Sequence, residues 1–328
     1  MGNVKVQSLR LDAAADYLGT GAIEVPEFET DIFDIVRRSS TALKRLKQVP
    51  ATGHPHRYFE QTGIAQGTAV DPRNIAATAS GPTRVERPAF IKAVVAQSNL
   101  SLFDKDVTEQ QGQFASVVAK DIEDIISGIE VTRASMLWAG TDTSLVAPTT
   151  PQWVGLLTQI TQQASVALAA SIIDGLKTQV AEMMALEGYV VMPTAIYLNP
   201  VLNDFIDQEA KAAHIDLKTK EVVAGVSVKY LSTQAGDLPL IPDPYMPTAS
   251  GAAYGFSAPS TGKLYFAVIA SESEIEIPVI SGKEYDPNPR LFQLGLTGNL
   301  SGQFVGVKFD ALIAKGASYA HAVVAVNR

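Results

Sequence analysis

The sequence contains no cysteine among its 328 residues, and this absence removes several kinds of chemistry at once. Without thiols there are no disulfide bonds, no thiolate nucleophiles and no cysteine-ligated zinc sites. Only four histidines are present. Two of them, His54 and His56, are close together but have no further ligands nearby, so we interpret them as part of a structural or solvated loop. We therefore predict no metal site and no cofactor.

Positive charge and long apolar runs are also scarce. The 26 Lys and Arg residues face 34 Asp and Glu residues, which gives a net charge of -8 and no basic patch of the kind that holds a phosphate backbone. The longest run of small apolar residues, 164–173, ends at Asp174 and is too short to cross a bilayer. The first residues, MGNVKVQSLRL, lack the apolar segment of a signal peptide. We expect a soluble protein whose main partner is neither a membrane nor nucleic acid.

Catalytic motifs are missing as well. The stretch GTDTS at 140–144 lacks the lysine and the second glycine of a phosphate-binding P-loop, and no G-x-S-x-G sequence is present. Three acids at alternate positions, Glu272, Glu274 and Glu276, are expected to share one solvated strand face. We predict that the protein is not an enzyme. A soluble hydrolase with a mixed α+β fold remains the alternative from another functional class.

The patterns that are present predict both helices and strands. An apolar fraction of 46% and a charged fraction of 18% are typical of a globular protein. Helical periodicity predicts a short helix from Asp31 to about Lys47 and a long one from Thr108, as its N-cap, to Ala139, with Gly140 as the stop. A further helix is predicted over 164–186, and a strand over 87–103.

The most regular pattern is a strand-to-helix joint at 189–212. Apolar runs at 189–192 and 195–198 predict strands, Asn199 is a good helix cap, and Pro200 suits the first helical position. One face of the following helix carries its apolar residues, which are Leu202, Phe205, Ile206 and Ala210.

The last third of the chain alternates with the period of two that strands show. This pattern begins near Glu221 and returns from Lys263 to the end, with Asn299 between two runs that predict a hairpin. Between these stretches the prolines are expected to exclude a central strand; they are Pro239, Pro242, Pro244 and Pro247. Together the elements indicate the α+β class.

Residues 49–88 have a different character. They are rich in Gly, Pro, Thr and Ala, poor in large aliphatic residues, and far longer than an ordinary loop. Such a segment cannot bury a core of its own. We predict a two-stranded excursion with bends at Gly67-Thr68 and Asp71-Pro72.

The excursion carries charges of both signs beside two aromatic residues. One interpretation is a solvated loop. The other, which we prefer, is that these residues contact a neighbouring copy of the chain, since arginine binds carboxylates with two parallel hydrogen bonds and aromatic residues provide buried anchors. The predicted interface residues are Arg57, Tyr58, Phe59, Glu60, Arg73, Arg84, Glu86 and Arg87.

The order of these parts, from about Asp31 onward, resembles the HK97-like major capsid protein of tailed bacteriophages. Three segments carry the resemblance: GHPHRYFEQTGIAQGTAVDP, RPAFIKAVVAQSNLSLFDKDV with the acidic helix that follows it, and ALEGYVVMPTAIYLNPVLNDF. The resemblance implies an HK97-like fold divided as follows: N-terminal arm 1–30, short helix of the peripheral domain 31–48, extended E-loop 49–100, peripheral domain with its spine helix 101–159, axial domain 160–280, and return strands of the peripheral domain 281–328.

The resemblance also implies a function. Copies of the chain are expected to assemble into pentamers and hexamers of an icosahedral shell around phage double-stranded DNA, without sequence-specific binding. The shell is expected to form in the host bacterial cytoplasm and to persist in the virion. The implied partners are the chain itself, a portal protein and, because no long charged scaffold segment is seen, a separate scaffolding protein; a cement or decoration protein is left open.

Two points stay open within the resemblance. The family's Lys–Asn cross-link cannot be assigned here, although Lys47 and Lys92 flank the excursion, so we predict a noncovalent shell. An encapsulin-like compartment protein shares the fold and remains the nearest alternative function.

Overall fold

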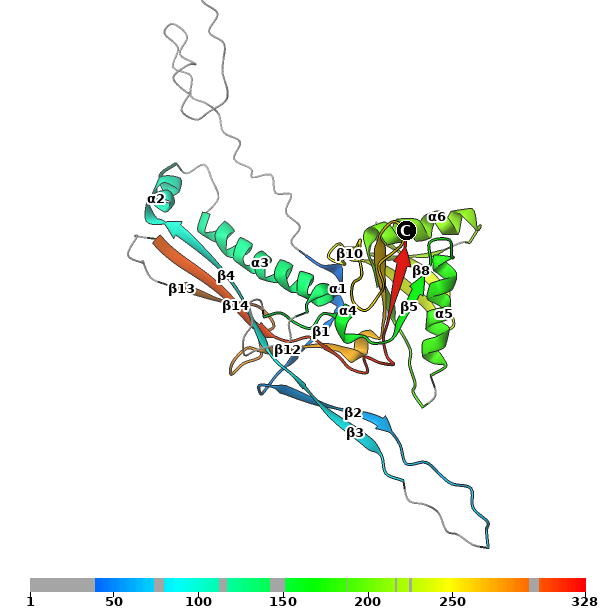
Figure 1. Ribbon diagram of the computed structural model, residues 1–328. Coiled ribbons are helices and arrows are strands. Elements are labelled where there is room, and N and C mark those ends of the chain that lie inside the picture. Colours follow the sequence, from blue (N-terminus) through cyan, green and yellow to red (C-terminus); the bar gives the residue numbers. More distant parts are fainter. Residues whose placement is uncertain are drawn as a thin grey trace, which may run out of the picture.

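A computed structural model describes residues 39–73, 80–111, 117–141, 151–186, 188–215, 217–223, 226–294 and 301–328. The predicted N-terminal arm, the start of the helix predicted from Asp31 and the turn predicted at Asn299 lie outside the described residues. The described part shows a long helix lying on one sheet, a compact unit of helices around a second sheet, and a two-stranded hairpin that projects away from both (Figure 1). Helices and strands are mixed throughout, as the α+β prediction requires.

The first sheet is built around its longest member, β14. This strand pairs antiparallel with β4 over ten residues, and on its other edge with β13 and the end of β12. The sheet has six strands: β1 (Lys47–Pro50), β4 (Lys92–Ser101), β12 (Ile275–Ile280), β13 (Arg290–Leu294), β14 (Ser301–Asp310) and β15 (Ile313–Ala314).

Helix α3 (Val117–Ala139) covers one face of this sheet (Figure 1). A methyl group on Gly306 of β14 would lie 2.5 Å from Ile125 Cγ2 and 2.9 Å from Ile129 Cδ1, so only glycine allows this close approach. The predicted stop is confirmed, because the helix ends at Ala139 and the Gly140 N–H bonds to the Met136 carbonyl at 3.1 Å.

The start of the predicted long helix is wrong. A separate helix, α2 (Leu102–Gln111), follows directly after β4, and Thr108 lies inside it rather than at an N-cap. The predicted strand over 87–103 is also divided: β3 (Thr83–Ala89) belongs to the hairpin, whereas β4 begins at Lys92 in the six-stranded sheet. The division falls where the chain enters the body and Ile91 becomes buried.

The described part of the first predicted helix is much shorter than expected. Helix α1 spans only Thr41–Arg45, because the Ser40 side chain accepts from the Leu43 N–H at 3.2 Å and so caps the helix there. Lys47, predicted as helical, instead begins β1, which pairs parallel with β12.

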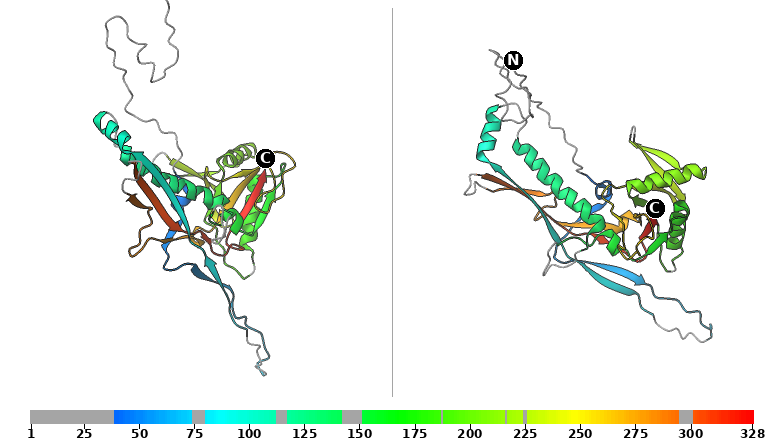
Figure 2. Two further views of the ribbon diagram at one scale, coloured as in Figure 1. Left: turned by 60° about the vertical axis from the view of Figure 1, so that its left-hand side comes forward. Right: turned by 45° about the horizontal axis from the view of Figure 1, so that its top comes forward.

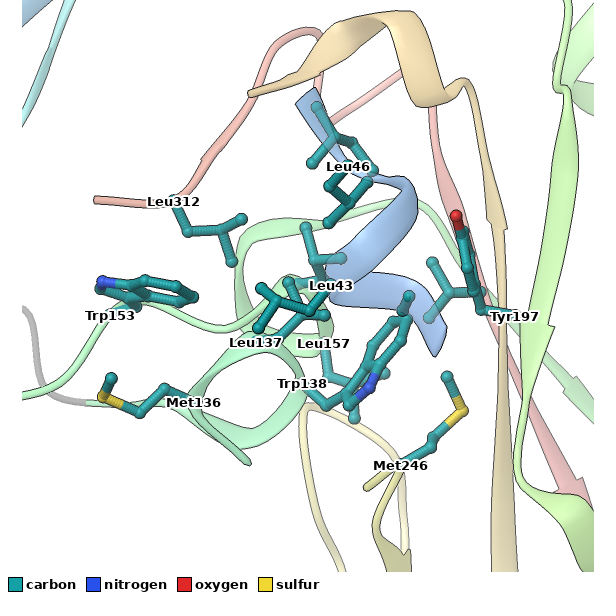
Figure 3. Close-up of a cluster of buried hydrophobic side chains, with 14 of the residues drawn as sticks. Leu43, Leu46, Met136, Leu137, Trp138, Trp153, Leu157, Tyr197, Met246 and Leu312 are labelled. Carbon is teal, nitrogen blue, oxygen red and sulfur yellow. The ribbon is translucent and has the colours of Figure 1, made fainter. Parts of the chain in front are cut away.

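Helix α1 lies in the apolar core that connects the two sheets. Figure 3 shows Leu43 of α1 and Leu46, the C-cap of α1, among Leu137 and Trp138 of α3, with Tyr197 of the second sheet beside them. All are almost fully buried, and the Trp138 and Tyr197 rings lie 5.6 Å apart. The two sheets are therefore joined by one continuous core.

The second sheet is the centre of the compact unit. Its main path runs in the order β5-β16-β11-β6-β9-β8-β7, with β10 beside β11. Helices α5 (Ile172–Met184) and α6 (Pro200–Ala212) pack against it, while the short α4 (Leu156–Gln159) contacts α3. The strands are β5 (Gln163–Val166), β6 (Ala195–Leu198), β7 (Lys218–Val223), β8 (Val226–Thr233), β9 (Gly236–Pro242), β10 (Thr248–Ala249), β11 (Leu264–Ala270) and β16 (Ala322–Asn327).

The predicted strand-to-helix joint is confirmed from β6 onward, where strand Ala195–Leu198 leads into helix α6. Asn199 Oδ1 accepts from the Val201 N–H at 3.0 Å, Pro200 opens the helix, and Leu202 is fully buried. The strand predicted at 189–192 is wrong, because the chain there is irregular and Val190 is 97% exposed.

Two further sequence predictions fail in this unit. The helix predicted from residue 164 begins at Ile172, since Ser171 caps it and 163–166 forms β5. The prolines do not exclude a central strand, because β9 lies between β6 and β8. Pro239 is the last residue of β9 in register with β8, and Pro242 the last in register with β6, so each proline stands where a pairing ends.

The chain crosses between the two sheets near its end. Strand β12 lies in the six-stranded sheet, whereas β16, the last strand, lies in the eight-stranded sheet between β5 and β11. The segment boundary predicted at 280/281 therefore does not coincide with the division between the sheets. No helix in the described residues has both the length and the apolar character needed to span a membrane.

Candidate assembly surfaces

The excursion predicted at 49–88 forms the projecting hairpin. Strand β2 (His56–Gly63) pairs antiparallel with β3, and the pair forms a sheet of its own (Figure 1, Figure 2). Beyond the strands, the Gln66 N–H bonds to Ser80 Oγ at 2.8 Å. Asp71 accepts from the Arg73 N–H in a turn, which confirms the bend predicted at Asp71-Pro72, whereas the chain shows no bend at Gly67-Thr68. Ile64 is 72% exposed, so the outer part of the hairpin buries no core of its own.

One face of the hairpin is anchored to the body of its own chain. Glu60 is buried; its Oε1 accepts from the Gly316 N–H at 2.8 Å, and its Oε2 accepts from Arg87 Nε at 2.6 Å. Burial also raises the pKa of Tyr58 on the same face. Gly316 has φ +65°, a backbone conformation that glycine adopts without strain. Glu60 therefore fastens β2 both to β3 and to the body.

The opposite face of the hairpin is exposed. By the strand register it carries Arg57, Phe59 and Gln61 on β2, opposite Glu86 and Arg84 on β3. Arg57 Nη1 lies 2.6 Å from Glu86 Oε1, and Arg84 Nε lies 3.2 Å from Gln61 Oε1. Phe59 is 71% exposed and lies beside Val190 and Met192, which are exposed as well, so it belongs to an apolar patch rather than standing alone.

The eight predicted interface residues thus divide into two groups. Tyr58, Glu60 and Arg87 serve the attachment of the hairpin to its own chain. The remaining residues, which lie on the exposed face or near the tip, are Arg57, Phe59, Arg73, Arg84 and Glu86. Contact of the second group with a neighbouring copy stays a prediction. Sequence reasoning missed the Glu60–Gly316 contact because the two residues lie 256 positions apart.

Removing the Glu60 anchor should loosen the hairpin. In Glu60→Ala the buried Gly316 N–H loses its acceptor, which costs about 1–3 kcal/mol locally, so we expect amide hydrogen exchange in β2 and β3 to accelerate about tenfold or more. Arg57→Ala removes a pair on the exposed face and should accelerate exchange less than about fivefold. Equal exchange rates in wild type and Glu60→Ala would show that the anchor is unimportant.

A cleft lies beside the hairpin base. It encloses about 480 Å³ between β2, the irregular stretch at 190–194 and the residues that precede β16. Phe59, Val190 and Met192 line it and are more than half exposed, while Tyr319 stacks on Tyr189 with ring centroids 4.2 Å apart. The cleft contributes apolar surface next to the exposed face of the hairpin.

A cluster of buried charges holds α3 on the six-stranded sheet. Arg133 and Asp310 are fully buried, with Nε and Oδ2 2.7 Å apart, and Trp153 Nε1 donates to Asp310 Oδ1 at 3.0 Å. Glu130 accepts from Arg133 Nη1 at 2.6 Å and lies 3.5 Å from Lys308 Nζ, whose pKa is lowered mainly by burial. Each charge faces an opposite one, so the cluster has the character of a structural clamp.

The remaining titratable groups show no catalytic arrangement within the part of the chain that the structure describes. No group of three His, Asp or Glu side chains there could hold a metal ion. The acids predicted to share a strand face do not, because Glu272 and Glu274 lie in a short 3-10 helix. Glu272 forms two hydrogen bonds with Arg45, at 2.7 and 2.9 Å, and accepts from the Tyr197 hydroxyl.

Comparisons with known proteins agree on one architecture. No family model and no curated protein sequence matches the chain. Among solved structures, the capsid of an empty GTA particle is similar with a TM-score of 0.65 at 12% identity, over 97% of this chain and all of the other. The holo-SrpI encapsulin complex of Synechococcus elongatus PCC 7942 is similar with a TM-score of 0.60 at 14% identity, over 98% of this chain and 97% of the other. A structure of Mycobacterium phage Ogopogo is similar with a TM-score of 0.61 at 15% identity, over 97% of this chain and 99% of the other.

The chain has the HK97-like capsid fold. The similarity extends over nearly the whole length of both chains, so it includes the hairpin and both sheets rather than one shared motif. At 11–15% identity the likeness concerns the fold, and the function is argued separately below.

Proposed function

We propose that this HK97-like chain is a shell protein that assembles from many copies of itself. The observation that carries the proposal is the hairpin, because its exposed face holds Phe59 and two arginines outside any core of its own chain. Contacts of this kind gain strength when each is repeated over many neighbours. Heterologous contacts between identical subunits close into rings when the rotation from one subunit to the next divides a full turn.

The finer proposal is a phage major capsid protein. In it, the chain forms pentamers and hexamers of an icosahedral shell around double-stranded DNA, with the compact eight-stranded unit toward the ring axes and the hairpin extending over a neighbour. A portal protein and a separate scaffolding protein would complete the particle, which would form in the host cytoplasm. The net charge of -8 supports a container that does not grip its DNA.

We further propose that the shell is noncovalent. Lys47, one of the two lysines beside the hairpin, lies 4.0 Å from the Glu276 carboxylate of its own chain, and Lys92 is 4% exposed. The Lys47 side chain is 67% exposed, so its contact with Glu276 leaves it accessible, whereas Lys92 is buried within its own subunit. The burial of Lys92 supports contacts between subunits without a cross-link at that residue.

An encapsulin-like compartment is the second candidate. The similarity to the holo-SrpI encapsulin complex covers nearly all of both chains and favours it as directly as the phage structures favour a capsid. The content of purified particles separates the two: nuclease-protected double-stranded DNA supports the capsid, and protein cargo without DNA supports the compartment.

Size-exclusion chromatography with light scattering tests assembly. Wild-type protein should elute as particles of megadalton mass. Arg84→Glu reverses a charge on the exposed hairpin face and should give a folded chain, with an unchanged circular dichroism spectrum, that stays below the mass of a ring. Lys283→Glu makes the same charge change outside the hairpin and should assemble normally. Normal particles from Arg84→Glu would defeat the proposed role of this face, and a wild-type dimer or tetramer would defeat the proposed function.

A further inference from the structure

Strand β13 leaves one edge of the six-stranded sheet open. Within the described residues it pairs only with β14, in a register that runs from Arg290 opposite Val307 to Leu294 opposite Gln303. In Figure 1 it lies on the outer side of β14, at the end of the molecule away from both the hairpin and the eight-stranded sheet. The backbone groups on its free edge can accept a further strand.

The side chains of β13 do not protect this edge. Its sequence is RLFQL, and its apolar members Leu291, Phe292 and Leu294 are 41–48% exposed. Natural edge strands are usually blocked by lysines, prolines or bulges, and an unblocked apolar edge is a site where another strand pairs. Arg290, at the first position, is the single charge in β13.

Strand β1 is a further edge strand, since it pairs only with β12 in the described residues. The edge on the other side of β14 from β13 is formed by β4 and is different in character. Strand β4 also pairs only with β14 in the described residues, but its exposed outer half carries Gln97 and Asn99 rather than large apolar side chains. Its one large exposed apolar residue is Val95. Of the two edge strands that flank β14, β13 has the apolar character that favours a stable contact.

We propose that β13 pairs antiparallel with β13 of a second copy across a twofold axis, which joins two six-stranded sheets into one. The inference rests on the proposed function, since in a shell of identical subunits the strand available for pairing belongs to another copy of the chain. An antiparallel self-pairing is isologous, so both copies use the same residues. Full overlap of five residues places Phe292 opposite itself and Leu291 opposite Gln293 of the partner subunit.

The sheet face supports this register. Phe292 stands opposite Val305 of β14, on the face away from α3, where Val305 and Val307 are only partly buried. Two facing phenylalanines would continue this apolar row from one subunit into the next, and aromatic pairs at directly opposite positions stabilise antiparallel strands. The contact would lie far from the hairpin and so adds a second, independent connection between subunits.

Disulfide trapping tests the pairing in the full-length protein, because the chain has no cysteine of its own. Directly opposite Cβ atoms lie about 4.5–5.5 Å apart, close to the span of a disulfide. Phe292→Cys should give mostly covalent dimers on a non-reducing gel after mild oxidation. The control is Val95→Cys, at a position that is 54% exposed on β4, another edge strand of the same sheet, and this variant should stay monomeric on the gel.

Each outcome decides the question. Dimers of Phe292→Cys without dimers of Val95→Cys support the pairing, even if no particles form and the proposed function fails. Particles of Phe292→Cys that contain no covalent dimers overturn the pairing and leave the proposed function standing. Equal dimer yields from both variants would indicate random collision and overturn it. A disulfide between one variant and the other, formed when the two are assembled together, would overturn it in favour of β13 pairing with β4.

Discussion

Replacing Arg133 with methionine should lower the free energy of unfolding by about 3–5 kcal/mol, because it leaves the buried Asp310 carboxylate without its charge partner. Both side chains are fully buried, and Trp153 Nε1 would be the remaining donor to Asp310 among the contacts described above. Because methionine fills most of the volume of arginine, the expected loss of stability comes from the missing charge and not from a cavity. The free energy of unfolding is measured by urea unfolding, followed by tryptophan fluorescence. Both proteins carry Arg84→Glu, which is expected to prevent assembly, so that the measurement reports the single subunit.

A matched control separates burial from charge pairing. Lys218 and Asp237 form an exposed pair with Nζ and Oδ2 2.8 Å apart, and Lys218→Met should leave the free energy of unfolding nearly unchanged. A loss below about 1 kcal/mol in Arg133→Met as well would show that the cluster does not hold α3 on the sheet.

Acidification should destabilise the protein through His321, by up to about 3 kcal/mol between pH 6.5 and pH 4. Burial lowers the pKa of His321 to about 4, because the ring is fully enclosed. The contact between Nε2 and the Lys315 carbonyl, at 3.1 Å, raises the pKa and offsets only part of this effect. In the unfolded chain His321 binds a proton near pH 6.5, whereas in the folded protein it binds one only near pH 4. The stability is therefore intact above pH 6.5, falls as the pH decreases to about 4, and then levels off.

The comparison with His321→Gln isolates this effect. Burial raises the pKa of Asp310 to about 6, so protonation of this carboxyl stabilises the folded protein as the pH falls from about 6 to 4. The stability of the wild type as a function of pH therefore contains the opposing effects of both groups. The difference in unfolding free energy between wild type and His321→Gln, measured by urea unfolding at pH 7.5, 6, 5 and 4, should change by about 3 kcal/mol. A difference that is constant with pH would show that His321 titrates normally in the folded protein.

Features set by local chemistry were predictable from the sequence. Asn199 and Pro200 fix the start of α6 with one side-chain hydrogen bond and one ring constraint, and Gly140 ends α3 for a similarly local reason. The hairpin was predictable because 49–88 lacks the apolar residues that any core requires. For the two helix ends, the decisive atoms lie within a few residues of one another, and for the hairpin the composition of one continuous segment was sufficient.

Features set by distant contacts were not predictable. Ser40 sets the start of α1 partly because its hydroxyl reaches Asp243, and Glu60 anchors the hairpin to Gly316. The prolines of β9 are tolerated because the pairings on its two edges end at those positions, which depends on how β6 and β8 approach. The sequence could not show which charged residues face the body until the register of β2 and β3 was known.

Electron microscopy of the purified wild-type protein tests the central claim most directly. We predict closed shells of uniform size, in which the hairpin of each subunit lies across an adjacent subunit with Phe59 covered. Single compact particles of about 35 kDa, with the hairpin folded onto its own chain, would contradict it.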